Sequence, residues 1–162
     1  MKKIGARVST VGVIAAAAAL LANVGAGSAT EFHCTASSQA PGTSAKRAPR
    51  RLVPGRPVEL ALCRYGAAPA YALDGSRLVT RRKRVHRLVH GLNALPTMPS
   101  GPVSCPADDG SSIVVYALYR RAATKIVHVG LTGCLIARRR DVVRWDAPSG
   151  GRFVHELEKL TR

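Results

Sequence analysis

The stretch Ile113-Val114-Val115-Tyr116-Ala117-Leu118-Tyr119, followed closely by Ile126-Val127-His128-Val129-Gly130-Leu131, decides the fold of this 162-residue chain. Both runs are rich in β-branched and aromatic residues, which favour β-strands. Residues 120–124, which lie between the two runs, predict a turn. The two strands therefore form a β-hairpin, and we expect the sheet around it to be antiparallel.

Shorter strand signals lie on both sides of this hairpin. Apolar residues alternate over 58–63, which predicts a strand with one apolar face. Residues 64–76 contain glycine, proline and aspartate and predict a loop, and 77–79 can add a short strand. A turn at 138–140 is expected to precede a further strand over 141–145.

Two segments have helical spacing. The apolar positions of 81–93 predict an amphipathic helix with Thr80 as its N-terminal cap. A second, short amphipathic helix is predicted near the C-terminus by Phe153, Val154, Leu157 and Leu160. Together these elements predict an α+β fold, in which an antiparallel sheet of about five strands carries two helices and is stabilised by disulfides.

The N-terminus has the three parts of a secretory signal. Lys2 and Lys3 precede an apolar stretch that is densest over 11–21, and small residues follow up to Ala29. The alternative is a membrane anchor, but a spanning helix needs about 20 mainly apolar residues and this stretch is shorter. We therefore expect a signal peptide over 1–29, cleaved near Ala29 or alternatively after Ala26, and a secreted mature chain without a transmembrane segment.

The mature chain is expected to have two parts. Residues 35–56 are rich in proline, glycine and serine, which is typical of flexible segments. We therefore predict a flexible arm over 30–56 and a single compact α+β domain over 57–162.

All four cysteines lie beyond the signal, at Cys34, Cys63, Cys105 and Cys134. An even number of cysteines in an exported chain indicates two disulfides. Three pairings are possible, and the favoured one joins Cys34 to Cys63 and Cys105 to Cys134. No Cys-x-x-Cys pair suggests a zinc site, so no metal or cofactor is expected.

The chain is strongly basic, with 25 lysines and arginines against 9 acidic residues and a formal net charge of +16. Such a charge favours anionic partners, here an anionic cell-surface polymer, a membrane surface or nucleic acid, although it can also serve solubility alone. Two clusters are candidate anion-binding residues: Arg81, Arg82, Lys83 and Arg84 at the start of the first helix, and Arg138, Arg139 and Arg140 in the expected turn.

Catalytic signals are weak. Glu59 and His128 could serve a secreted ribonuclease as base and acid, but nothing in their spacing selects them. His86 and His90 lie one helical turn apart without a third metal ligand, which favours a solvated helix face. The run 108–111 lacks the later ligands of a calcium loop, so it predicts a turn. We therefore expect no catalytic residues.

The order of features over 57–135 resembles the Streptomyces subtilisin inhibitor family. The matching features are the strand 58–63, the helix ending in Leu92-Asn93-Ala94-Leu95, the pair Cys105-Pro106, the hairpin and Cys134. The resemblance implies a small exported protein with two disulfides, a five-stranded antiparallel sheet and two helices. It also implies that the loop Cys105, Pro106, Ala107, Asp108 and Asp109 binds a secreted serine protease.

By the same resemblance, Ala107 would be the specificity residue and Ala107–Asp108 the scissile bond, with the loop braced by the Cys105 disulfide. Two departures stand beside these expectations. The family's other disulfide joins the strand to the helix, whereas residues 81–93 contain no cysteine. Asp108 and Asp109 also place two carboxylates beside the expected scissile bond.

The sequence therefore predicts a secreted, non-enzymatic binding domain, in its sharpest form a protein similar to serine-protease inhibitors. The alternative is a basic binder of an anionic cell-surface polymer or nucleic acid, and a ribonuclease-like enzyme comes third.

Overall fold

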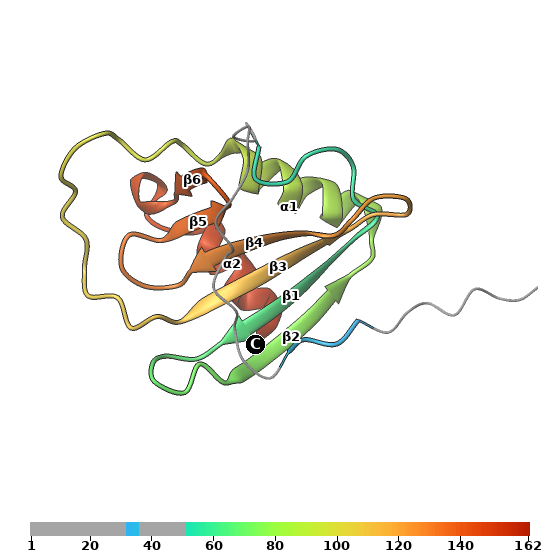
Figure 1. The fold of residues 1–162 in the computed structure, drawn as a ribbon, viewed down its shortest axis with the longest axis horizontal. Coiled ribbons are helices and arrows are strands. Elements are labelled where there is room, and N and C mark those ends of the chain that lie inside the picture. The colour runs from blue at the N-terminus through green and yellow to red at the C-terminus, as the bar shows by residue number, and fades with distance from the viewer. Residues whose placement is uncertain (1–31, 36–50) are drawn as a thin grey trace, which may run out of the picture. The chain divides into compact units, whose positions relative to one another are not determined.

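The strands form one antiparallel sheet in the order β2-β1-β3-β4-β5-β6 (Figure 1). The computed structural model describes residues 32–35 and 51–162. The strands of the sheet are β1 (Glu59–Tyr65), β2 (Leu73–Val79), β3 (Ser112–Leu118), β4 (Lys125–Gly130), β5 (Ile136–Arg139) and β6 (Val142–Trp145).

The predicted hairpin lies in the middle of this sheet. β3 pairs with β4 in a register that sets Val115 opposite Val127, and β1 pairs with the other edge of β3. Because residues directly opposite each other share a face of the sheet, alternate positions of these strands face one core. The α+β class and the antiparallel sheet are confirmed, with six strands where about five were expected.

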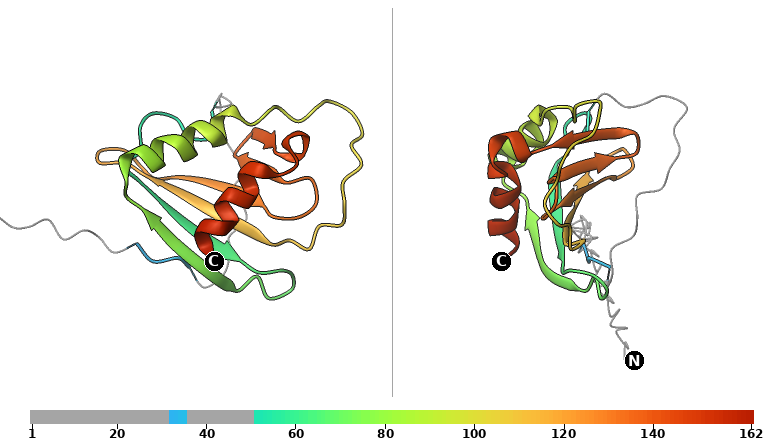
Figure 2. Two further views of the ribbon diagram at one scale, coloured as in Figure 1. Left: turned by 180° about the vertical axis from the view of Figure 1, so that it is seen from behind. Right: turned by 90° about the vertical axis from the view of Figure 1, so that its left-hand side faces the viewer.

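Both helices lie on the same face of the sheet, as Figure 2 shows. They are α1 (Arg82–Ala94) and α2 (Arg152–Thr161), and a short 3-10 helix, Ala147–Ser149, precedes α2. α1 contributes Val85, Leu88 and Leu92 to the buried core, which β1, β3 and β4 line from the sheet side. The two helices approach closely, because a Cβ atom at Gly91 would collide with the Phe153 ring.

Several sequence-based boundaries need correction. β1 continues to Tyr65 and β2 starts at Leu73, so the loop predicted over 64–76 is much shorter. The predicted turn at 138–140 instead contains the end of β5, whose arginines conceal an alternating strand pattern. The residue at the N-cap of α1 is Arg81 rather than Thr80, and no side chain caps the helix.

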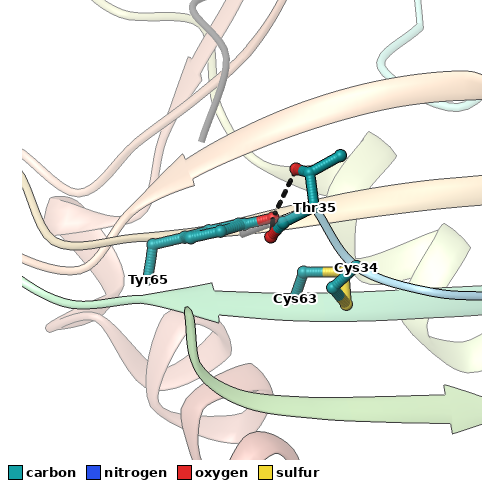
Figure 3. The surroundings of a disulfide bond; sticks show 4 residues. All are labelled: Cys34, Thr35, Cys63 and Tyr65. Atoms are coloured by element: carbon teal, nitrogen blue, oxygen red, sulfur yellow. Dashed lines mark hydrogen bonds between the residues drawn. A yellow bond between two sulfur atoms is a disulfide. The ribbon is translucent and has the colours of Figure 1, made fainter. Parts of the chain in front are cut away.

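The second face of the sheet carries the first disulfide (Figure 3). Cys34 is bonded to Cys63 of β1, with the two Cα atoms 5.8 Å apart. The Tyr65 hydroxyl donates to the Thr35 carbonyl oxygen at 3.1 Å and also lies 3.1 Å from the Thr35 hydroxyl. Phe32 packs on Tyr116 of β3 with the ring centroids 4.7 Å apart. Residues 32–35 are therefore fastened to the face opposite the helices.

The packed region begins earlier than the expected boundary at residue 57. Leu52 and Val53 are fully buried, and the Asn93 side chain exchanges two hydrogen bonds with the Val53 backbone, at 2.8 and 2.9 Å. The expected signal over 1–29 and most of the expected arm, 36–50, lie outside the described residues. Among the residues that are described, no helix is long and apolar enough to cross a membrane.

Candidate functional site

The long connection between α1 and β3 presents the loop predicted from the sequence, Cys105–Asp109. All five residues of this loop are exposed. Cys105 is bonded to Cys134, which precedes β5, and the two Cα atoms are 5.0 Å apart. The pairing favoured from the sequence is therefore present in full, and the disulfide fixes the start of the loop.

Thr132 fixes the other end of the same loop. Its hydroxyl oxygen lies 2.9 Å from Asp108 Oδ1 and 2.7 Å from Asp109 Oδ1, so its one proton is donated to either carboxylate. The same oxygen accepts the Asp109 backbone N–H at 3.1 Å. One threonine of the β4–β5 connection thus gathers both acidic residues.

Backbone hydrogen bonds complete this arrangement. The Asp108 carboxylate accepts the Gly110 N–H at 2.9 Å, and the Asp109 carboxylate accepts the Ser111 N–H at 2.8 Å. The Ala68 N–H donates to the Asp109 carbonyl oxygen at 2.8 Å, which joins the β1–β2 connection to the loop. The carboxylates beside Ala107 are therefore held by their own loop and its neighbours.

The ionisation of Asp109 reflects these contacts. Hydrogen bonds from the Ser111 side chain and backbone, and then from Thr132, lower the pKa of the Asp109 carboxyl below its usual value. Gly110 has a φ of +79°, and a Cβ atom there would lie 2.8 Å from Cε1 of Tyr71. Only glycine suits both this backbone conformation and this close approach. The loop is therefore a defined structure, although it is exposed.

The predicted anion-binding residues differ in their exposure to solvent. In the first cluster Arg81, Arg82 and Lys83 are exposed and Arg84 is half-buried; in the second, Arg138 and Arg140 are exposed. Arg139 is only 6% exposed, and its guanidinium donates to the Arg51 carbonyl oxygen at 2.8 Å. Arg139 therefore anchors the segment before β1 instead of facing solvent.

An open pocket of about 860 Å³ lies beside the start of α1. Its lining includes Gly55, Arg56, Pro57 and Val58 from the segment before β1, and Glu59, the first residue of β1. The remaining lining residues are Thr80, Arg82, Val85, His86, Val89 and Arg120. Sequence reasoning singled out Arg82 but missed Arg56 and Arg120. Those two arginines are isolated in the sequence from the first cluster, and only the fold brings them to it.

The weaker catalytic candidates do not form a site. Glu59 is opposite Leu118 on β3, whereas His128 is opposite Val114. These positions are four residues apart along β3, which separates them by about 13 Å along the strand. No group of three potential metal ligands occurs in the part of the chain that the structure describes, and His86 instead lines the pocket.

Comparison with known proteins adds no relative. No family model matches the chain, and neither a curated protein nor a solved structure matches it significantly.

Proposed function

We propose that this protein is a secreted, non-enzymatic binding domain that presents Cys105–Asp109 to a partner protein, in the manner of a serine-protease inhibitor. The observation that carries the proposal is the double bracing of an exposed five-residue loop. The disulfide fixes Cys105, and Thr132 fixes Asp108 and Asp109. Secretion is part of the proposal, because two disulfides are compatible with an extracellular location.

The bracing favours recognition because binding costs less when the loop is already ordered. Each side chain or loop residue that must be immobilised weakens an interface, so a fixed loop retains more of its contact energy. Ala107 lies between the two braces and is exposed, which makes it available as the central contact. The carboxylates of Asp108 and Asp109 accept hydrogen bonds from their own loop and from Thr132. These donors partly offset the negative charge, which reduces the repulsion between the two carboxylates and an approaching protease.

The test is inhibition of subtilisin-like, chymotrypsin-like and trypsin-like serine proteases by the protein with both disulfides formed. We expect stoichiometric inhibition of a protease that accepts a small residue, and its loss in Ala107→Pro. Ala107→Lys should transfer inhibition to a trypsin-like enzyme, because the introduced cation suits an acidic specificity pocket. Ala123→Lys makes the same change at an exposed position in the β3–β4 turn and should leave the target unchanged. The proposal would be refuted if neither the parent protein nor Ala107→Lys inhibited any of the three classes of protease at micromolar concentration.

A further inference from the structure

The pocket beside α1 lies at the opposite end of β3 from the braced loop. The loop precedes Ser112, the first residue of β3. Arg120 of the pocket lies two positions after Leu118, the last residue of β3. Figure 1 shows three segments converging at this second end: the chain before β1, the β3–β4 turn and the start of α1. The pocket is therefore a separate candidate site and does not depend on the function proposed above.

The wall that carries Arg56 is firmly anchored. The Tyr119 hydroxyl donates to the Pro54 carbonyl oxygen at 2.5 Å, and the Val58 N–H donates to the Leu118 carbonyl oxygen at 2.8 Å. These two hydrogen bonds hold the chain on both sides of Arg56. Pro54 is bonded to Tyr119, which follows β3, and Val58 is bonded to Leu118, the last residue of β3. Arg56 therefore projects from a defined backbone, so little ordering of the chain is needed when a ligand binds.

Positive charge predominates around the pocket. Arg56, Arg82 and Arg120 come from three separate segments, and His86 lies one helical turn after Arg82 on the same side of α1. Glu59 is the single acidic residue of the lining.

Ion pairing distinguishes these arginines from others in the molecule. Arg64, Arg87 and Arg162 each form a salt bridge with an acidic side chain. Within residues 32–35 and 51–162, the three pocket arginines form none. Their guanidinium groups therefore remain available to an anion from solution.

The remaining lining limits the class of ligand. Val58, Val85 and Val89 give the pocket an apolar part, and Val58 is 38% exposed. No aromatic side chain lines the pocket, so it offers no platform for stacking nucleic-acid bases. Exposed cations continue beyond the pocket at Arg81, Lys83 and Arg121, which favours a ligand with repeated charges over a single ion.

We infer that this pocket binds the phosphate groups of a phosphodiester polymer of the cell-surface type, with an uncharged aliphatic or sugar backbone. Planar guanidinium groups match the oxygen pairs of a phosphate, and the pocket lining supplies three of them. The valines contact the backbone between phosphates, while Arg81, Lys83 and Arg121 attract the neighbouring repeats. Binding releases counterions and is therefore weakened by salt.

The experiment measures binding of a synthetic glycerol-phosphate oligomer by titration calorimetry at several salt concentrations, using the protein with both disulfides intact. Arg82→Gln/Arg120→Gln should lower the affinity about tenfold, because two charged hydrogen-bond donors are lost. The slope of log affinity against log salt should fall by about two. Arg138→Gln/Arg140→Gln removes the same charge from residues outside the pocket and should change the affinity by less than about threefold.

A second pair of variants changes the affinity in the opposite direction. Glu59→Gln removes the single acidic side chain of the lining and should tighten binding about two- to threefold. Asp141→Asn makes the equivalent change at an exposed position outside the pocket and should have no effect beyond the error of measurement.

Three results would overturn the inference. One is an equal loss of affinity in the two arginine pairs, which would assign binding to the general positive charge. The others are tighter binding to single-stranded DNA, or to vesicles containing anionic lipid, than to the oligomer at the same phosphate concentration. Failure of this test leaves the protease test untouched, because the two sites share no residue.

Discussion

The two disulfides span the same sequence distance but have different surroundings. Each joins cysteines 29 positions apart. Cys63 is fully buried with Tyr65 and Val114, whereas Cys105 is exposed in a loop. Loop closure in the unfolded chain depends on the span, so each bond should contribute about 3–4 kcal/mol by this effect. The difference shows that equal constraint of the unfolded state can serve different purposes in the folded one.

The first disulfide lies among packed side chains on the second face of the sheet, and the second holds an exposed loop in position. Around Cys34–Cys63, the ring contact of Phe32 with Tyr116 and the hydrogen bond of Tyr65 cover part of the second sheet face. Around Cys105–Cys134, the neighbouring contacts are the polar ones of Thr132 with two exposed aspartates. The comparison predicts that the first bond matters more for stability and the second more for recognition.

The largest effect on stability is expected from Cys34→Ala/Cys63→Ala. Loss of loop closure costs about 3–4 kcal/mol, and truncation of the buried Cys63 side chain adds about 1 kcal/mol. Urea unfolding followed by circular dichroism should show a decrease of about 4–5 kcal/mol, a large part of the 5–15 kcal/mol that holds a typical domain together. A loss smaller than that of the second disulfide would contradict the comparison.

Cys105→Ala/Cys134→Ala should lower the free energy of unfolding by about 3–4 kcal/mol through loss of loop closure. Cys105 is exposed and Cys134 is 6% exposed, so truncation of the side chains adds less than at the fully buried Cys63. Its effect on the loop should be greater than its effect on the core. Limited proteolysis of the folded protein should cut between residues 105 and 109 faster than in the parent, while the Cys34→Ala/Cys63→Ala protein retains the parental rate there. Equal cutting of the loop in both variants would show that the disulfide does not brace it.

Much of the fold could be predicted because its signals are local. The run 113–119 consists of apolar and aromatic residues throughout, and the hairpin follows from the short turn after it. The elements that were missed have mixed signals. In β5, Arg138 and Arg139 indicate a solvated turn, yet Arg139 is buried against the backbone of Arg51, 88 positions away. A contact of that separation leaves no mark on either local sequence.

The candidate sites divide in the same way. The loop could be predicted because Cys105–Asp109 is one continuous stretch of sequence. The role of Thr132 could not, because its hydrogen bond to Asp109 joins residues 23 positions apart. The pocket could be predicted only in part. Arg82 belongs to a visible basic run, whereas Arg56 and Arg120 are brought to it by the anchoring of residues 54–58 on β3.

Thr132→Val tests the second brace without touching the disulfide. Valine keeps the shape of threonine but removes the hydroxyl that contacts both aspartates, so we expect a loss of about 1–2 kcal/mol. Backbone amide exchange at residues 108–111 should accelerate, and any protease inhibition should weaken. Thr124→Val, at an exposed position of the β3–β4 turn, is the matched control and should change neither measurement. Unchanged exchange in Thr132→Val would show that the disulfide alone orders the loop.

The smallest expected effects are those of pH, which should separate the two regions. His128 faces the same side of the sheet as Cys63, because both are opposite Val114, and Arg138 is its neighbour on β5. Burial lowers the pKa of His128 below its usual 6.5. The unfolded chain therefore binds more protons between the two pKa values, and stability falls as pH drops from about 6.5 through the folded pKa.

Asp109 should respond only at lower pH. Its pKa is lowered from 3.8 by hydrogen bonds from Ser111 and Thr132, so its stabilising effect is complete above about pH 3.8 and is lost as pH falls through the folded value. Nuclear magnetic resonance titration should therefore show the His128 transition, below pH 6.5, before the change of the Ser111 amide. His128→Gln should abolish the first step alone and Asp109→Asn the second alone. If both regions changed together in a single step, the two disulfide-linked regions would form one cooperative unit, and the distinction between packing and presentation would not hold.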